Sequence, residues 1–229
     1  MNRNDLLRSI AAGGQLRVSI NTGNRALVQT DGDELSGVSP ALAKRLANEL
    51  GIPMQPVVYN GAGLASADVD NNTWDVGFLA INKKRAEKAS FTRPYIVIEA
   101  TYAVRAQSSF SELNEVDQDG VSVLTSIGSA YDTYLQANLK HASLERFGTP
   151  GESFAAFRAG RCDAVAGIRE SLMAHLGDDP NVRLLPGALT SVQQAMVLPG
   201  TDNPAIQALD QFVARAIADG FVAAHTGSD

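Results

Sequence analysis

Three consecutive cations, Lys83, Lys84 and Arg85, follow a hydrophobic run that ends at Ile81. The chain as a whole is acidic, with a net charge of -6 at pH 7. A guanidinium stays charged and can bind a carboxylate through two parallel hydrogen bonds, whereas a lysine ammonium makes a less directional, more strongly hydrated contact. We therefore expect Arg85 to bind an anion and the two lysines to lie on the outer surface. The competing interpretation is an ordinary strand end at the surface.

A second candidate anion site is Gly128-Ser129-Ala130, which opens a predicted helix directly after a predicted strand. The first turn of a helix exposes unpaired N–H groups and the positive end of the helix dipole, and both favour an anion. Ser129 is also a good N-cap, an explanation that needs no ligand. Taken together, Arg85 and Ser129 suggest that a carboxylate is held between two lobes.

Motifs typical of enzymes and of metal sites are absent from the sequence. It contains no G-x-S-x-G elbow, no P-loop, and no G-x-G-x-x-G after a strand. His141, His175 and His225 lack metal-ligand spacing, and Cys162 is the single cysteine. We expect neither a metal nor a cofactor.

Composition excludes two classes of partner. An isoelectric point near 5.1 argues against nucleic acid, because phosphate binding needs a basic face. No apolar run approaches the roughly 18 to 20 residues of a membrane helix, so we expect no membrane insertion. Hydrophobic residues make up 45% of the chain and charged residues 19%, which is typical of a globular protein.

Strands and helices alternate along the chain, which predicts an α/β protein with mainly parallel sheets. A short amphipathic helix is expected around Leu6 and Leu7. The clearest helix spans 39–52, with Ser39 as its N-cap and Gly51 as its stop. The predicted strands are 16–20, 54–59, 75–81, 95–104, 121–126, 143–147, 162–168 and 191–199, and the other predicted helices are 128–140, 151–160, 169–177 and 203–220.

The strand–helix pattern runs through two similar series, which predicts two lobes. The long extended run 95–104 is long enough to leave one lobe and enter the other. We expect the first lobe to comprise 1–105 plus 196–229 and the second to comprise 106–195, with hinges near Arg105 and Gln194.

Over almost its whole length the chain resembles the type II periplasmic solute-binding proteins, in the branch that binds amino acids. The resemblance rests on the order and spacing of "GGQLRVSI", "SGVSPALAKRLANELGI", "WDVGFLAINKKRAEKASFTRPY", "GVSVLTSIGSAYDTYL" and "FRAGRCDAVAG". It implies two Rossmann-like α/β lobes joined by two hinge strands, with the ligand enclosed between the lobes.

The resemblance also assigns roles to residues. Arg85 matches the arginine that holds the ligand's carboxylate, and Ser129, beside Ala130, matches the hydroxyl residue that contacts the same group. The strand end at Phe78, Leu79 and Ala80 is expected to line the ligand. Asn21 and Asn24 are expected to reach the cleft from the loop after the first strand, and Gln194 from the second hinge.

Two departures from the family pattern concern ligand specificity. Phe78 and Ala80 stand where small hydroxyl residues are usual. Gly167, Ile168 and Arg169 occupy the stretch in which amino-acid binders place an aspartate for the ligand's ammonium. If Arg169 points inward, a second anionic group on the ligand is the simpler interpretation; if it points outward, it is a solvated residue at a helix start.

The function expected from the resemblance is capture of a small carboxylate-bearing ligand, an amino acid or a related polar metabolite, by a monomer that serves an ABC transporter permease. One alternative is a dehydratase of the cyclohexadienyl or arogenate type on the same fold. Glu99 and Asp132 are the carboxylates nearest the proposed cleft, although a hinge contact and a helix-dipole role explain them without catalysis. Another alternative is a cytoplasmic ligand-sensing domain. The expected location is periplasmic if a signal peptide was removed, and cytoplasmic otherwise.

Overall fold

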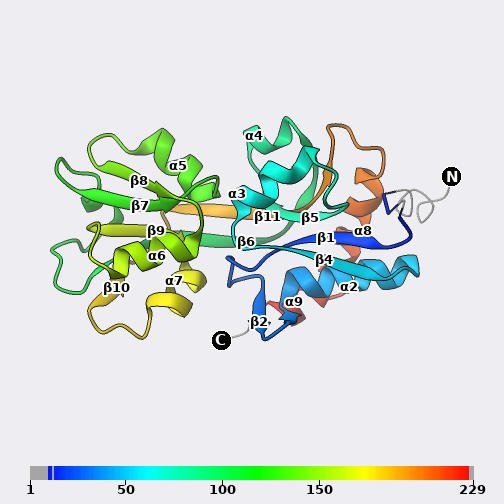
Figure 1. Cartoon of the computed structure of the whole chain (residues 1–229), viewed down its shortest axis with the longest axis horizontal. Coiled ribbons are helices and arrows are strands. Elements are labelled where there is room, and N and C mark those ends of the chain that lie inside the picture. Colours follow the sequence, from blue (N-terminus) through cyan, green and yellow to red (C-terminus); the bar gives the residue numbers. More distant parts are fainter. Residues whose placement is uncertain (1–9, 12, 227–229) are drawn as a thin grey trace.

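Two α/β lobes lie side by side along the longest axis of the molecule (Figure 1). The computed structural model describes residues 10, 11 and 13–226. The helix predicted around Leu6 and Leu7 lies outside the described residues. Two long strands, β6 (Ala89–Arg105) and β11 (Thr190–Pro199), run antiparallel and extend through both lobes. The chain therefore crosses between the lobes twice, and the predicted two-lobed α/β fold is confirmed.

The first lobe contains the N-terminal strands and the last helices of the described chain. Its parallel strands β1 and β4 pair with each other, and the short β2 and β3 form a hairpin. Its elements are β1 (Leu16–Asn21), β2 (Gln29–Asp31), β3 (Glu34–Ser36), α2 (Val38–Leu50), β4 (Met54–Tyr59), α3 (Ala62–Ala67), a 3₁₀ turn (Asp68–Asp70), β5 (Gly77–Ala80), α4 (Lys83–Ala86), α8 (Ile206–Ala218) and α9 (Phe221–His225).

The second lobe is built around the parallel strands β7, β8 and β9. Its core is formed by Leu124, Phe154, Phe157, Val165 and Leu172, which pack the helices onto the sheet. Its elements are a 3₁₀ turn (Leu113–Val116), β7 (Ser122–Ser126), α5 (Ala130–Asn138), β8 (Ser143–Phe147), α6 (Pro150–Arg158), β9 (Ala164–Ile168), α7 (Arg169–Leu176) and β10 (Val182–Leu184).

One mixed sheet continues through both lobes, in the order β5-β11-β6-β9-β7-β8, with β10 also paired to β6. The pairs that involve β6 or β11 are all antiparallel. The expectation of mainly parallel sheets is therefore wrong. It overlooked that a chain which crosses between two lobes and returns must lay its two crossing strands in opposite directions.

Partner exchange along β6 indicates where the chain passes from one lobe to the other. The strand pairs with β11 as far as Ala100, and from Ala100 to Val104 it pairs with β9 of the second lobe. Arg105 lies beyond this point, beside Val182 of β10. The pairing favours a hinge nearer Ala100 than Arg105, while the lobe limits at 105 and 195 remain predictions.

Helix α2 forms where the sequence predicts it, but its N-terminus differs in detail. Gly37, not Ser39, is the N-cap residue, and Ser39 lies inside the first turn, where its hydroxyl hydrogen-bonds to the hydroxyl of Tyr95 at 3.0 Å. Gly51 ends the helix in the left-handed conformation, with φ of 66°, as expected of a C-terminal glycine. The N-cap prediction is thus wrong, and Ser39 instead lies beside the space between the lobes.

Candidate functional site

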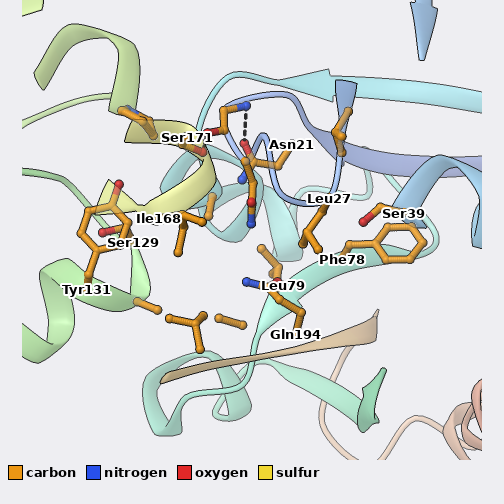
Figure 2. A pocket seen from close by; sticks show the side chains of 18 of the residues that line it. Asn21, Leu27, Ser39, Phe78, Leu79, Ser129, Tyr131, Ile168, Ser171 and Gln194 are labelled. Carbon is orange, nitrogen blue, oxygen red and sulfur yellow. Dashed lines mark hydrogen bonds between the residues drawn. The ribbon is translucent and has the colours of Figure 1, made fainter. Parts of the chain in front are cut away.

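A small cavity, here called the interlobe cavity, lies where the two lobes meet, and its volume is about 40 Å³. Figure 2 shows Leu27, Ser39 and Phe78 on the first-lobe side, facing Ser129, Tyr131 and Ile168 on the second-lobe side. Leu79 of β5 and Gln194 of β11 complete the wall between them. Residues far apart in the sequence thus converge on one space.

Arg85 enters the cavity wall because a single helical turn folds it back after β5. The side chain of Asn82 caps that turn by accepting a hydrogen bond from the Arg85 N–H at 2.8 Å. The guanidinium then donates Nη1–H to the carbonyl of Ala80 at 2.9 Å and Nη2–H to the carbonyl of Gly128 at 2.8 Å. Arg85 therefore bridges β5 of the first lobe and the turn before α5 of the second.

The three cations separate as the sequence predicts. Arg85 is 6% exposed, whereas Lys83 and Lys84 are both exposed. No carboxylate forms an ion pair with Arg85 within the described part of the chain, and burial lowers the pKa of its guanidinium to about 10. The group remains charged at neutral pH, so the site holds a buried cation without a protein counter-ion.

Arg85 also borders a second, wider space. This outer groove has a volume of about 640 Å³ and is bounded by Gly63, Asn82, Gly128 and Arg146. Gly63 and the Gly128 turn are in close contact beside it, and Leu79 and Arg85 line both the groove and the interlobe cavity. Arg85 thus borders both spaces.

Ser129 is the N-cap of α5, and its hydroxyl accepts a hydrogen bond from the Asp132 N–H at 2.9 Å. Gly128 before it has φ of 73°, a conformation that favours glycine. The carboxylate of Asp132 accepts the Gly128 N–H at 2.9 Å and is held by Arg146 through two hydrogen bonds of 2.7 and 2.8 Å. This network fixes the turn that carries Ser129 into the cavity wall.

Direct hydrogen bonds join the lobes on the other side of the cavity. The Ser171 hydroxyl of α7 accepts the Arg25 N–H at 3.0 Å and donates to the carbonyl of Gly23 at 3.2 Å. Together with the Arg85–Gly128 contact, these bonds show a closed arrangement of the lobes. Ser171 was not predicted from the sequence, because its role depends on a loop 146 residues away in the chain.

Most of the residues predicted to form the site do come together around the cavity. Its lining includes Asn21, Asn24, Phe78, Leu79, Ala80, Arg85, Ser129, Ala130 and Gln194. Asn21 uses its side-chain oxygen to accept the Gly23 N–H at 3.1 Å, the hydrogen bond drawn in Figure 2. The side-chain oxygen of Asn24 is buried and lacks a hydrogen-bond partner among the described residues. Asn24 therefore has spare hydrogen-bonding capacity for a ligand, and Gln194 places a second side-chain amide in the lining.

Arg169 and Glu99 do not line the interlobe cavity, which corrects their placement at the ligand. Arg169 donates to the carbonyl of Gly187 at 2.5 Å and lies 3.4 Å from the Glu99 carboxylate. The Glu99 side chain is 51% exposed. Arg169 therefore points outward, and β9 instead presents Ile168 to the cavity.

The polar groups that line the cavity are amides, hydroxyls and one guanidinium. Among the lining residues, all of which are described, there is no Asp, Glu, His, Lys or Cys. Tyr131 is titratable in principle, but burial raises its pKa to about 12, and its hydroxyl is bonded to that of Ser126 at 2.6 Å.

Across the described residues, no helix is long and apolar enough to span a membrane.

Solved structures with closely similar folds include several amino-acid-binding proteins. Holo ArgBP from T. maritima superposes with a TM-score of 0.79, at 22% identity, over 91% of this chain and 92% of its own. A substrate-binding protein of an amino acid ABC transporter from Streptococcus pneumoniae, bound to L-arginine, gives a TM-score of 0.82 at 15% identity over 96% and 95% of the two chains. The ancestral amino acid-binding protein AncCDT-1, a precursor of cyclohexadienyl dehydratase, gives 0.80 at 20% identity over 95% and 96%.

A curated relative, the cyclohexadienyl dehydratase of Pseudomonas aeruginosa, is 27% identical over 143 residues, which are 60% of this chain. The match spans only 53% of that enzyme's length. The sequence profile of the bacterial extracellular solute-binding proteins, family 3, matches residues 16–226, nearly the whole chain. The chain therefore belongs to the family 3 bacterial extracellular solute-binding proteins.

Proposed function

We propose that this protein captures a small ligand by its carboxylate in the interlobe cavity and delivers it to an ABC transporter. The observation that carries the proposal is Arg85, a buried guanidinium without a carboxylate partner among the described residues. A buried charge of this kind is costly unless it is paired. A ligand carboxylate would supply the missing partner.

The second lobe offers a matching half of the carboxylate site. Ser129 and Ala130, at the start of α5, line the cavity, and the positive end of a helix dipole favours an anion there. A carboxylate between this turn and Arg85 would contact both lobes at once. Because these contacts exist together only when the lobes are closed, ligand binding would shift the hinge equilibrium toward closure.

Binding without catalysis is the better-supported function. A dehydratase needs a general acid beside the leaving group, and the described cavity lining contains no carboxylic acid or histidine. Asp132, an earlier candidate, is fully buried and held by Arg146 and the Gly128 N–H. The partial match to cyclohexadienyl dehydratase is explained by shared ancestry of the fold.

Transport is proposed from the family and from the names of solved relatives, two of which are substrate-binding proteins of amino acid ABC transporters. In this proposal the protein acts as a monomer in the periplasm, and its closed form contacts a membrane permease. A ligand-sensing domain in the cytoplasm would use the same cavity. Co-purification with a permease would separate these two roles.

The test is a thermal-shift screen of the wild-type protein against carboxylate metabolites, followed by calorimetry on the hits. Arg85→Gln is expected to weaken binding at least tenfold, because a buried charged hydrogen-bond partner is lost. Lys83→Gln, which removes an exposed charge two residues away, is the matched control and should bind within twofold of wild type. Equal loss in both variants would show that Arg85 acts only through net charge.

A further inference from the structure

We propose that the ligand is a small monocarboxylate whose second polar group is an uncharged hydroxyl, not an α-amino acid. This inference rests on the proposed function, since it concerns the second group of a ligand whose carboxylate is bound by Arg85. It follows from the charges in the cavity, from the groups left unpaired there, and from the room available.

The cavity has one full charge, and that charge is positive. Arg85 would neutralise the carboxylate, so an ammonium on the same ligand would be left without an anion. The described lining contains no Asp or Glu. A buried ammonium without a counter-ion is strongly disfavoured.

The nearest carboxylates are already engaged or face away. Asp132 lies behind the α5 turn, where Arg146 and the Gly128 N–H occupy its two oxygens. Glu99 is half exposed and pairs with Arg169 outside the cavity. Neither can receive an ammonium without breaking an existing ion pair.

Backbone carbonyls at the cavity are also partly used. Arg85 donates hydrogen bonds to the carbonyls of Ala80 and Gly128, and the Ser171 hydroxyl donates one to the carbonyl of Gly23. One acceptor that remains is the side-chain oxygen of Asn24, which is buried and without a partner among the described residues, and the side-chain amide of Gln194 also lines the cavity. One neutral donor, such as a hydroxyl, satisfies one amide oxygen and adds no charge.

The volume of the cavity also favours a small ligand. The closed cavity of about 40 Å³ is well below the roughly 150 Å³ that holds benzene, and each water needs about 10–15 Å³. The wall also includes the apolar side chains of Leu27, Phe78, Ile168 and Val192. A small acid is therefore favoured over a ligand with a long cationic side chain.

The experiment compares four three-carbon probes by calorimetry at pH 7.5: L-lactate, pyruvate, propionate and L-alanine. L-Lactate and L-alanine differ only in the hydroxyl or ammonium on the second carbon. We expect L-lactate to bind at least tenfold more tightly than L-alanine. We also expect L-lactate to bind more tightly than propionate, which lacks the donor for Asn24.

Equal or tighter binding of L-alanine would overturn the inference. So would absence of binding by all four probes, whether or not L-arginine binds. If L-arginine binds and Arg85→Gln abolishes that binding, the proposed carboxylate capture stands and only the ligand class is wrong. If neither the probes nor L-arginine nor the wider screen binds, the proposed function falls as well.

A second variant tests the charge argument directly. Asn24→Asp keeps the shape of the side chain and places an anion at the unpaired acceptor. The ratio of L-alanine to L-lactate affinity should rise at least tenfold in this variant, provided that its melting curve stays cooperative. An unchanged ratio in a folded Asn24→Asp protein would show that Asn24 does not face the second group of the ligand.

Discussion

Closure of the two lobes depends on a glycine contact that a single methyl group can block. Gly63 is the second residue of α3, and its α-carbon packs against the Gly128 turn of the opposite lobe. A Cβ at position 63 would lie 2.3 Å from the carbonyl oxygen of Ile127, which is backbone and cannot rotate away. Gly63→Ala should therefore oppose the closed form specifically.

Gly63→Ala is expected to stabilise the ligand-free open form and to destabilise the ligand-bound closed form. Alanine in a helix is favoured over glycine by about 0.5–1 kcal/mol, so the ligand-free open form should be as stable as wild type or more stable. Overpacking at the lobe contact costs about 1–3 kcal/mol in the closed form. At 1.4 kcal/mol per tenfold, that corresponds to roughly 5- to 150-fold weaker binding.

The assay combines melting temperature without ligand and calorimetric affinity with a ligand from the screen. Gly151→Ala is the matched control, because Gly151 is also the second residue of its helix and a Cβ there would meet no atom within 4 Å. The reasoning fails if Gly63→Ala binds within twofold of wild type. It fails equally if the variant loses stability in the free form, because the clash would then not be confined to closure.

Three further outcomes are expected. Ser171→Ala should weaken binding by roughly 3- to 10-fold, because closure then leaves the Arg25 N–H without its acceptor; an unchanged affinity by calorimetry would contradict this. Arg146→Met should leave the Asp132 carboxylate buried and unpaired, and should lower stability by about 3–5 kcal/mol in a denaturant titration; a loss under 1 kcal/mol would contradict it. Affinity for a carboxylate ligand should stay constant from pH 6 to pH 9, since burial lowers the pKa of Arg85 only to about 10 and raises that of Tyr131 to about 12; a change above threefold over that range by calorimetry would reveal another titrating group.

Local signals in the sequence were sufficient for the elements and for Arg85. Helix α2 could be predicted from its apolar spacing and Gly51, and α5 from Ser129. The separation of Arg85 from Lys83 could be predicted from the chemistry of the two side chains, because only the guanidinium suits a buried, directional site. These inferences need only neighbouring residues.

Features that depend on the relative position of the lobes could not be predicted in the same way. Ser171 bonds to a loop from the other lobe, and Gly63 is required to be small only because the Gly128 turn lies against it. The outward position of Arg169 depends on the Gly187 carbonyl, which its own segment does not reveal. Each of these is a contact between distant segments, and a single sequence carries no periodicity that encodes it.

The buried charge at Arg85 links ligand recognition to closure. In the closed arrangement Arg85 lies against the Gly128 turn of the opposite lobe, and burial lowers the pKa of its guanidinium to about 10, so the unliganded closed form holds a cation that is costly to bury. A carboxylate removes this penalty, because it supplies the opposite charge in the same low-dielectric space. The differential affinity that drives closure therefore comes from relief of an unpaired cation as well as from new contacts.

Replacing Arg85 by a neutral residue should then have two effects at once: it abolishes carboxylate capture, and it lets the empty lobes close more often. Small-angle scattering of ligand-free Arg85→Gln should show a radius of gyration at or below that of the wild type, and a larger value would show that the guanidinium holds the lobes together rather than apart.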